Sequence, residues 1–171
     1  MVILKALLVA EEYFALEYDL VVSLQELKML ADACHIEVES VIVQRLKEKT
    51  SQYYIGKGKV EEISKRIDGI DLVIFNEELT PMQVKNLTDA FDIEVSDRSD
   101  LILRIFETRA KTQEAKLQVK IARNQYMLPR LAGLREEIYS QQGGSGFRGG
   151  GEKQIELDRR LIHRQIIQYK K

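Results

Sequence analysis

Short apolar runs alternate with helical patterns over the first hundred residues of the chain. Four of these runs predict β-strands, at residues 2–10, 36–43, 72–75 and 93–95. Apolar residues at helical spacing predict helices around 23–34 and 59–67. This alternation is typical of βαβ units, so it predicts an α/β fold with a four-stranded, mostly parallel sheet and flanking helices.

A third helix is marked by its first residues. Thr80 is a favourable N-cap, Pro81 occupies the first helical position, and Gln83 stands where a capping box needs a glutamine or glutamate. Apolar residues at helical spacing then give the helix a core-facing side.

From Ser99 the pattern predicts a single helix of about thirty residues, which would be roughly 45 Å long. It contains no glycine or proline before Pro129. Its apolar residues form one near-heptad stripe, made of Phe106, Ala110, Leu117, Ile121, Leu128 and Leu131. An exposed stripe of this kind requires a partner helix.

Residues 152–171 supply that partner, because Ile155, Ile162, Ile166 and Tyr169 share one face. The two helices predict a long antiparallel coiled-coil hairpin that follows the α/β region. We therefore divide the chain into an α/β region, 1–97, and a helical hairpin, 98–171. The connection between them, 133–151, holds seven of the ten glycines, so we interpret it as a glycine-rich tip loop.

Charge is strongly segregated along the chain. Residues 1–100 hold 11 Lys and Arg against 20 Asp and Glu, whereas residues 101–171 hold 15 against 7. A basic second region points to a polyanionic partner, because clustered cations release the counterions condensed on phosphates. An internal electrostatic match between the two regions is the alternative.

Other features exclude several classes of protein. No apolar stretch approaches the length of a membrane span, and the apolar opening at residues 2–10 contains Lys5 and lacks a cleavage-type ending, so we expect a soluble cytoplasmic protein. The single cysteine, Cys34, cannot form an internal disulfide and is expected to be a buried structural thiol. No metal-ligand set, carboxylate dyad or activated nucleophile emerges, so catalysis by these 171 residues is not expected.

The tip loop has a composition suited to RNA. Its glycines allow close backbone approach, Arg148 supplies a planar cationic donor, and Tyr139 and Phe147 have rings that stack on unpaired bases. A flexible connection without a partner is the alternative. Arg159 and Arg160, close to the tip, are equally suited to rRNA phosphates and to carboxylates of the facing helix.

A nucleotide-binding reading of the glycines finds little support. Gly146 and Gly151 have P-loop spacing, but Glu152 replaces the lysine and no apolar strand precedes them. A second cluster precedes the helix at 59–67, and helix N-termini favour anions. It gives a minor hypothesis of phosphate binding, by Gly56, Lys57, Gly58 and Lys59.

Several motifs resemble the HflX family of GTPases. The stretch from Gly143 to Glu152, followed by Glu156-x-Asp158-Arg159-Arg160, resembles the glycine-rich signature of that family. Residues 54–59, 80–87, 97–118 and 129–131 agree in order, so the resemblance covers roughly residues 50–165. Two departures are Gly150, where the family usually has proline, and Gln142, where a further glycine is common.

The resemblance implies a translation factor that binds the large ribosomal subunit and its rRNA. It implies that the loop lies near the peptidyl transferase centre and that the whole protein splits or rescues ribosomes under GTP control. The implied RNA-contacting and ribosome-contacting residues are Gln141, Gly143, Gly144, Gly146, Phe147, Arg148, Gly149, Gly151, Arg159 and Arg160.

The resemblance also implies a larger polypeptide. Its GTPase domain would carry GTP and magnesium, whereas these 171 residues contain no P-loop and are expected to bind no cofactor. Two other functions stay open: a purine-nucleotide-binding α/β domain with its own NTPase activity, and a structural adaptor.

Overall fold

The computed structural model describes residues 2–13, 19–46, 50–141 and 164, and for 131–141 it describes the backbone alone. The chain forms two compact units, Met1–Ile105 and Phe106–Lys171. Each unit is considered by itself below.

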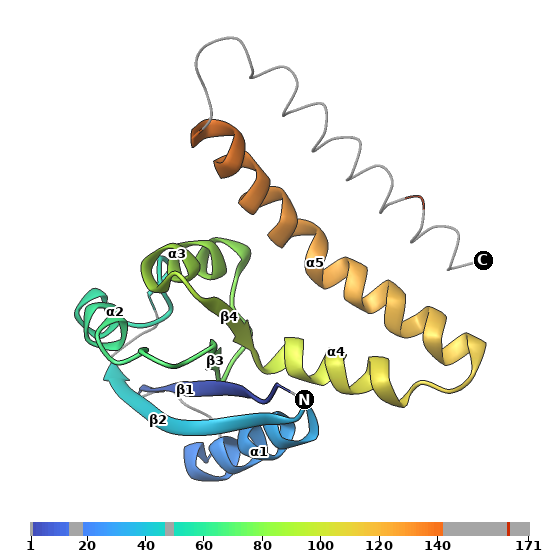
Figure 1. Ribbon diagram of the computed structural model, residues 1–171, viewed down its shortest axis with the longest axis horizontal. Helices are drawn as coiled ribbons and strands as arrows, with labels where there is room; N and C mark the ends of the chain where they lie inside the picture. The colour runs from blue at the N-terminus through green and yellow to red at the C-terminus, as the bar shows by residue number, and fades with distance from the viewer. Residues whose placement is uncertain (1, 14–18, 47–49, 142–163, 165–171) are drawn as a thin grey trace. The chain divides into compact units, whose positions relative to one another are not determined.

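The first unit is built on a four-stranded sheet. Its strands are β1 (Leu4–Tyr13), β2 (Ile36–Leu46), β3 (Leu72–Phe75) and β4 (Glu94–Asp97). All neighbouring strands pair in parallel, in the order β2-β1-β3-β4 (Figure 1). The predicted four-stranded sheet is therefore confirmed. The chain adds β2 on one side of β1 and then adds β3 and β4 on the other side, so the direction in which strands are added changes between β1 and β3.

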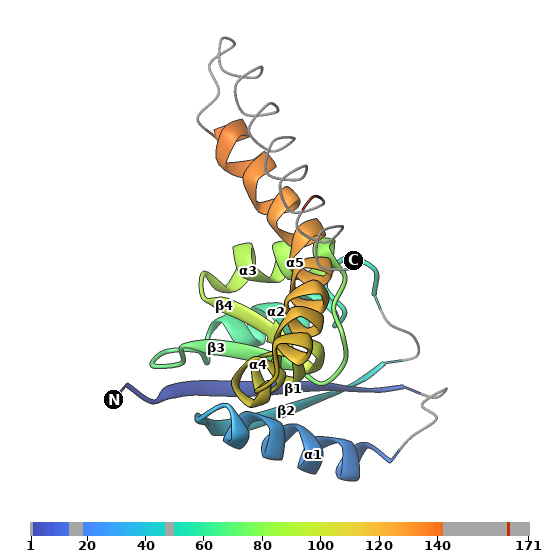
Figure 2. The same ribbon diagram turned by 90° about the vertical axis from the view of Figure 1, so that its right-hand side faces the viewer.

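Helices cover both faces of this sheet. Leu27 and Ala31 of α1 (Leu20–Ala33) and Leu101 of α4 (Arg98–Arg109) pack in the core on one face. The core on the other face contains residues of α2 (Lys57–Ser64) and α3 (Pro81–Phe91). Figure 2 shows α1 on the opposite side of the sheet from α2 and α3.

Burial on both faces explains the apolar run in β1. Ala6 and Leu8 belong to the core beneath α1, while Leu7 and Val9 belong to the core beneath α2 and α3. A strand covered on both sides reads as a continuous apolar run, because neither face is left to water. The short apolar run of β3 is buried throughout for the same reason.

Side-chain caps fix where the helices begin. Thr80 Oγ1 accepts a hydrogen bond from the Gln83 N–H, at 3.2 Å, and the Gln83 side chain accepts one from the Thr80 N–H, at 2.9 Å. The predicted capping box of α3 is therefore confirmed. Asp19 caps α1, at 2.9 Å from the Val21 nitrogen, which starts the helix three residues before the predicted Ser23.

The prediction of one unbroken helix from Ser99 is wrong. α4 ends at Arg109, and α5 (Gln113–Gln141) begins after a break at residues 110–112. Thr112 causes the second start, because its Oγ1 accepts a hydrogen bond from the Ala115 N–H at 3.1 Å. The predicted stripe is consequently divided, with Phe106 on α4 and Leu117 on α5.

The predicted tip loop also starts too early, because α5 continues through Pro129 and Gly133 to Gln141. Residues 134–141 include leucine, arginine and two glutamates, which favour helix enough to carry it past a single glycine. The rest of the loop lies outside the described residues. So does the predicted partner helix, apart from Arg164, which is helical, and the coiled-coil hairpin remains a prediction.

Candidate nucleic-acid interface

Most of the residues predicted to contact RNA lie outside the described part of the chain. Gln141 is the last residue of α5, and only its backbone is described. The structure therefore describes the helices that precede the glycine-rich loop and leaves the loop itself a prediction. The predicted residues outside the described ranges are Gly143, Gly144, Gly146, Phe147, Arg148, Gly149, Gly151, Arg159 and Arg160.

The Asp97-Arg98 motif joins β4 to α4 with no intervening loop. The buried Asp97 carboxylate accepts hydrogen bonds from the N–H groups of Leu79 and Asp100, both at 2.9 Å. Ser96 Oγ donates to Asp100 Oδ2 at 2.6 Å. These bonds cap the first turn of α4 and fix its start to the end of the sheet.

Arg98 connects three elements of the first unit. Its Nε donates to the Asn76 carbonyl at 2.9 Å, beyond the end of β3, and its terminal nitrogens reach the Ser23 carbonyl at 2.7 Å and Glu26 at 3.4 Å on α1. The motif was visible in the sequence, but this role was not predicted. The guanidinium of Arg98 is thus engaged by the protein's own acceptors.

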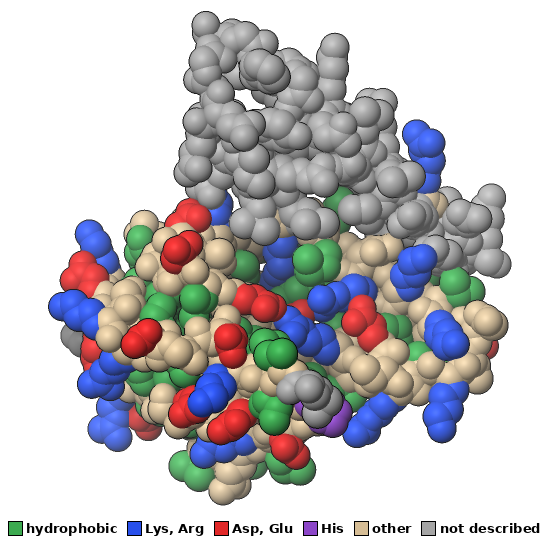
Figure 3. Space-filling view, in the orientation of Figure 1, with side chains coloured by type: hydrophobic (Ala, Val, Ile, Leu, Met, Phe, Trp, Pro, Cys, Tyr) green, Lys and Arg blue, Asp and Glu red, His purple; other side chains and the backbone are tan. Residues whose placement is uncertain are grey.

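The basic residues of the second unit have fewer acidic neighbours. From 106 to 130 only two acidic residues, Glu107 and Glu114, stand among the basic ones. In Figure 3 blue side chains gather over α4 and the start of α5. The six basic residues of this segment are Arg109, Lys111, Lys116, Lys120, Arg123 and Arg130.

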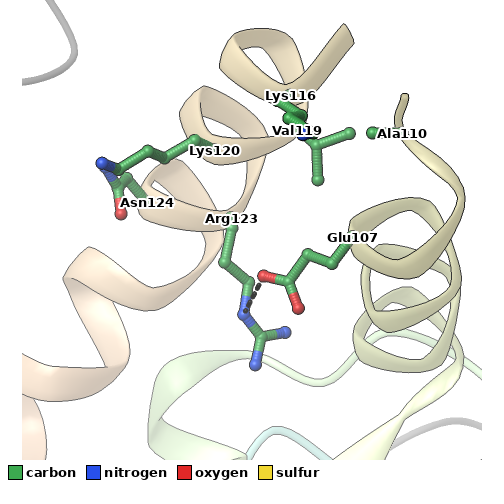
Figure 4. Close-up of a pocket in the computed structure, with 7 residues that line it drawn as sticks. All are labelled: Glu107, Ala110, Lys116, Val119, Lys120, Arg123 and Asn124. Atoms are coloured by element: carbon green, nitrogen blue, oxygen red, sulfur yellow. Dashed lines mark ion pairs between the residues drawn. The ribbon is translucent and has the colours of Figure 1, made fainter. Parts of the chain in front are cut away.

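A hollow of about 370 Å³ lies where the end of α4 meets the start of α5. Figure 4 shows Glu107 of α4 and Arg123 of α5 pointing toward one another, and Arg123 Nε lies 3.5 Å from Glu107 Oε1. This ion pair holds Arg123 at the wall. The described residues that line the hollow are Glu107, Ala110, Lys116, Val119, Lys120, Arg123 and Asn124.

Arg130 has a different environment from these residues. Its guanidinium carbon lies 3.6 Å from the centroid of the Tyr126 ring, and its NH1 donates to the Tyr126 carbonyl at 2.9 Å. With 8% of its surface exposed, Arg130 is a buried cation held against the Tyr126 ring within the second unit. Arg130 therefore presents little of its surface to a phosphate in solution.

The predicted phosphate-binding segment begins α2, two residues earlier than expected. Gly56 is its N-cap, and the Gly56 N–H donates to Gln44 Oε1 at 2.8 Å. Lys59 Nζ lies 2.8 Å from Glu62 Oε2. Lys57 and Gly58 are exposed, so two of the four predicted residues face water while the other two are engaged by neighbouring side chains.

The carboxyl ends of β1 and β3 form the switch point where ligands bind in many folds of this kind. Here that edge carries Glu11 and Glu12 after the apolar part of β1, and Glu77 and Glu78 after β3. Tyr54 Oη donates to Glu77 at 2.5 Å. Clustered carboxylates repel phosphate groups, so this edge is poorly suited to a nucleotide.

Other kinds of site are not evident in the described part of the chain. No three His, Cys, Asp or Glu residues there are grouped so that they suit a metal ion. None of the described helices is both long and apolar enough to cross a bilayer. Cys34, expected to be buried, is only partly buried.

Family models identify the class of protein. The description "GTP-binding GTPase N-terminal" matches residues 22–107, and "GTP-binding GTPase Middle Region" matches residues 109–171. The two matches meet close to the boundary between the compact units. The chain is thus built from the regions that accompany a GTPase domain.

Curated relatives specify the family. GTPase HflX of Caldanaerobacter subterraneus subsp. tengcongensis is 45% identical over 146 residues, with 84% of this chain and 34% of the relative covered. GTPase HflX of Escherichia coli is 38% identical over 158 residues, with 91% and 37% covered. The chain belongs to the HflX family of GTPases, and it spans about a third of the length of these relatives.

A solved structure shows the same fold. A GTP-binding protein from the archaeon Sulfolobus solfataricus, in complex with GDP, aligns with a TM-score of 0.64 at 21% identity. The alignment covers 98% of this chain and 45% of that one. A second structure, of SsGBP and GDP, gives a TM-score of 0.68 at 23% identity and covers 98% and 42% of the two chains.

Proposed function

We propose that the chain is the non-catalytic, ribosome-binding module of an HflX-type GTPase that splits or rescues ribosomes in the cytoplasm. Its basic arm, the predicted hairpin of residues 98–171, presents the glycine-rich loop to rRNA of the large subunit, near the peptidyl transferase centre. A GTPase domain of the same polypeptide, with its GTP and magnesium, supplies the catalytic step.

The observation that carries this proposal is the segregation of charge. The excess of basic residues lies after residue 100, while the residues before it are strongly acidic. Several cations of the first unit are neutralised there, as in the Lys5–Glu39 ion pair at 2.9 Å. A polyanion such as rRNA is therefore attracted to the arm and repelled by the sheet domain.

Co-sedimentation tests the proposal. The 171-residue chain should pellet with purified large ribosomal subunits, and rising salt should release it, because phosphate contacts are lost as counterions compete. Arg148→Ala should weaken pelleting, and deletion of residues 143–151, which removes Arg148 together with the glycines, should remove most of it. Failure of the intact chain to pellet at any salt concentration would contradict the proposal.

Nucleotide binding by the α/β unit is the second candidate, favoured by the exposed Lys57 and Gly58 at the start of α2. Titration with ATP and GTP separates the two functions. Tight nucleotide binding that disappears in a Lys57→Ala, Lys59→Ala double variant, without association with ribosomes, would support the second candidate over the first.

A further inference from the structure

We propose that the hollow between α4 and α5 binds the phosphate backbone of RNA, as a second contact separate from the glycine-rich loop. This inference rests on the proposed function, since it assigns a specific surface of the arm to the same partner. None of the residues predicted from the sequence to bind RNA lines this hollow.

The first argument is the row of cations on α5. Lys116, Lys120 and Arg123 follow at intervals of four and three residues, so they lie on one side of the helix. Residues four apart are separated by about 6 Å along the axis. Regularly spaced cations suit an RNA strand, because every nucleotide of the strand carries one negative charge.

The second argument is that one of these cations, Lys116, is available to a ligand. Lys116 is exposed and forms no ion pair with any described residue. It is an exposed ammonium group among the residues that line the hollow. Cations of this kind bind phosphates readily, because no internal contact has to be broken first.

The third argument is a hydrogen-bond donor without an acceptor. The amide nitrogen Nδ2 of Asn124 is shielded from solvent, and it has no hydrogen-bond partner among the described residues. Asn124 lines the hollow beside the cations. A buried polar group left unsatisfied is unfavourable, so a phosphate or ribose oxygen that reaches this nitrogen after a small shift of its neighbours relieves an existing penalty.

The arrangement favours RNA over an acidic polypeptide. The hollow offers donors and cations together with the apolar Val119 and Ala110, which suit the carbon surface of a ribose. Seventeen residues separate Asn124 from Gln141, which corresponds to about 26 Å of helix. An RNA surface of that length meets both the hollow and the end of α5.

The salt dependence of binding tests the inference directly. The probes are purified large ribosomal subunits and a fluorescent single-stranded RNA of mixed sequence. A Lys116→Ala, Lys120→Ala double variant should bind roughly tenfold or more weakly in 0.1 M salt. Its slope of log affinity against log salt should be shallower by about 2 than that of the unaltered chain.

A matched control removes two exposed lysines from the first unit, in a Lys28→Ala, Lys65→Ala variant. It has the same net charge as the test variant, so it should keep the original slope if the contact is local. Equal slopes for all three proteins, or equal losses in the two variants, would overturn the inference.

Asn124 provides an independent readout. Asn124→Ala should weaken binding to RNA while leaving the melting temperature unchanged or slightly raised, because an unsatisfied buried donor is removed. Asn124→Asp should weaken binding further through repulsion of phosphate. Unchanged affinity in both variants would contradict the inference, as would polyglutamate that binds as tightly as RNA and depends on Asn124.

Different results would contradict the proposed function and the proposed RNA contact at the hollow. If the intact chain binds neither probe, the proposed function fails. If it binds both, and loop deletion weakens binding while the hollow variants bind normally with the original slope, the inference fails and the proposed function stands.

Discussion

Arg98 donates two hydrogen bonds to Asn76, one from Nε to the carbonyl oxygen at 2.9 Å and one from NH2 to Oδ1 at 2.7 Å. Asn76 directly follows β3, and Arg98 is the first residue of α4. The pair therefore ties the end of a central strand to the start of a helix. Because NH2 also donates to the carbonyl of Ser23, α1 is held in the same network.

Replacing Arg98 by alanine should lower the stability of the first unit. The buried Asn76 would lose two donors, and hydrogen bonds to charged groups contribute about 1.5–3 kcal/mol each before the remaining groups adjust. We expect a loss of about 2–4 kcal/mol in the free energy of unfolding, measured by urea denaturation.

Arg45→Ala is the matched control for this substitution. Arg45 pairs with Glu12 at 2.7 Å, but its side chain is 86% exposed. Exposed ion pairs contribute about 0–1 kcal/mol, so this variant should unfold close to the unaltered chain. Equal losses in the two variants would show that the Arg98 network has no special role.

Thr80→Ala removes the cap of α3. One N–H at the helix start would lose its acceptor, so we expect a loss of about 1 kcal/mol in the free energy of unfolding. Thr80→Ser keeps the hydroxyl and should restore most of it. A serine variant as unstable as the alanine variant would indicate that the threonine methyl group, and not the cap, stabilises the helix.

The Lys59 ammonium donates a hydrogen bond to Glu62 and holds the pKa of that carboxyl below its usual value. A lowered pKa adds stability above the unfolded pKa, and this contribution disappears as the pH falls through the folded pKa. NMR titration should show the Glu62 pKa rising in Lys59→Ala. Added ATP or GTP should leave the Glu62 pKa unchanged. A rise of this pKa on addition of nucleotide would show that Lys59 leaves Glu62 to bind a phosphate.

Burial raises the pKa of the Cys34 thiol, and the nearby Asp100 carboxylate adds to this while Arg104 opposes it. Because the folded state holds the proton more tightly, stability from this group is complete below the unfolded pKa and declines as the pH rises above it. Iodoacetamide should therefore modify folded Cys34 more slowly at pH 8 than the same thiol in urea. Equal rates would contradict the raised pKa.

Local signals in the sequence were sufficient for much of the first unit. The capping box of Thr80 and Gln83 depends on contacts within one turn, and the β3 run depends only on burial of four consecutive residues. The start of α5 was missed, although Thr112 is a favourable cap, because no glycine or proline drew attention to it. The extension of α5 past Gly133 was missed because the loop was placed from its glycines, and Gly133 was counted among them.

Long-range contacts were not predictable from local patterns. Arg98, Asn76 and Ser23 are brought together only once the order of the strands is known, since they are far apart in the sequence. The hollow between α4 and α5 exists because the predicted single helix is broken at residues 110–112. Its lining residues looked like an ordinary solvated helix face in the sequence, so the spacing of the lysines suggested no site.

The direct junction of β4 and α4 restricts which changes in chain length the protein tolerates. One residue inserted between Asp97 and Arg98 would turn the following helix by about 100°. Leu101 would then leave the core beneath α1, and Arg98 would no longer face Asn76. An insertion at residues 110–112 would leave the core of the first unit intact, so the sheet and its helices should tolerate it, although it would change the hollow that Ala110 helps to line.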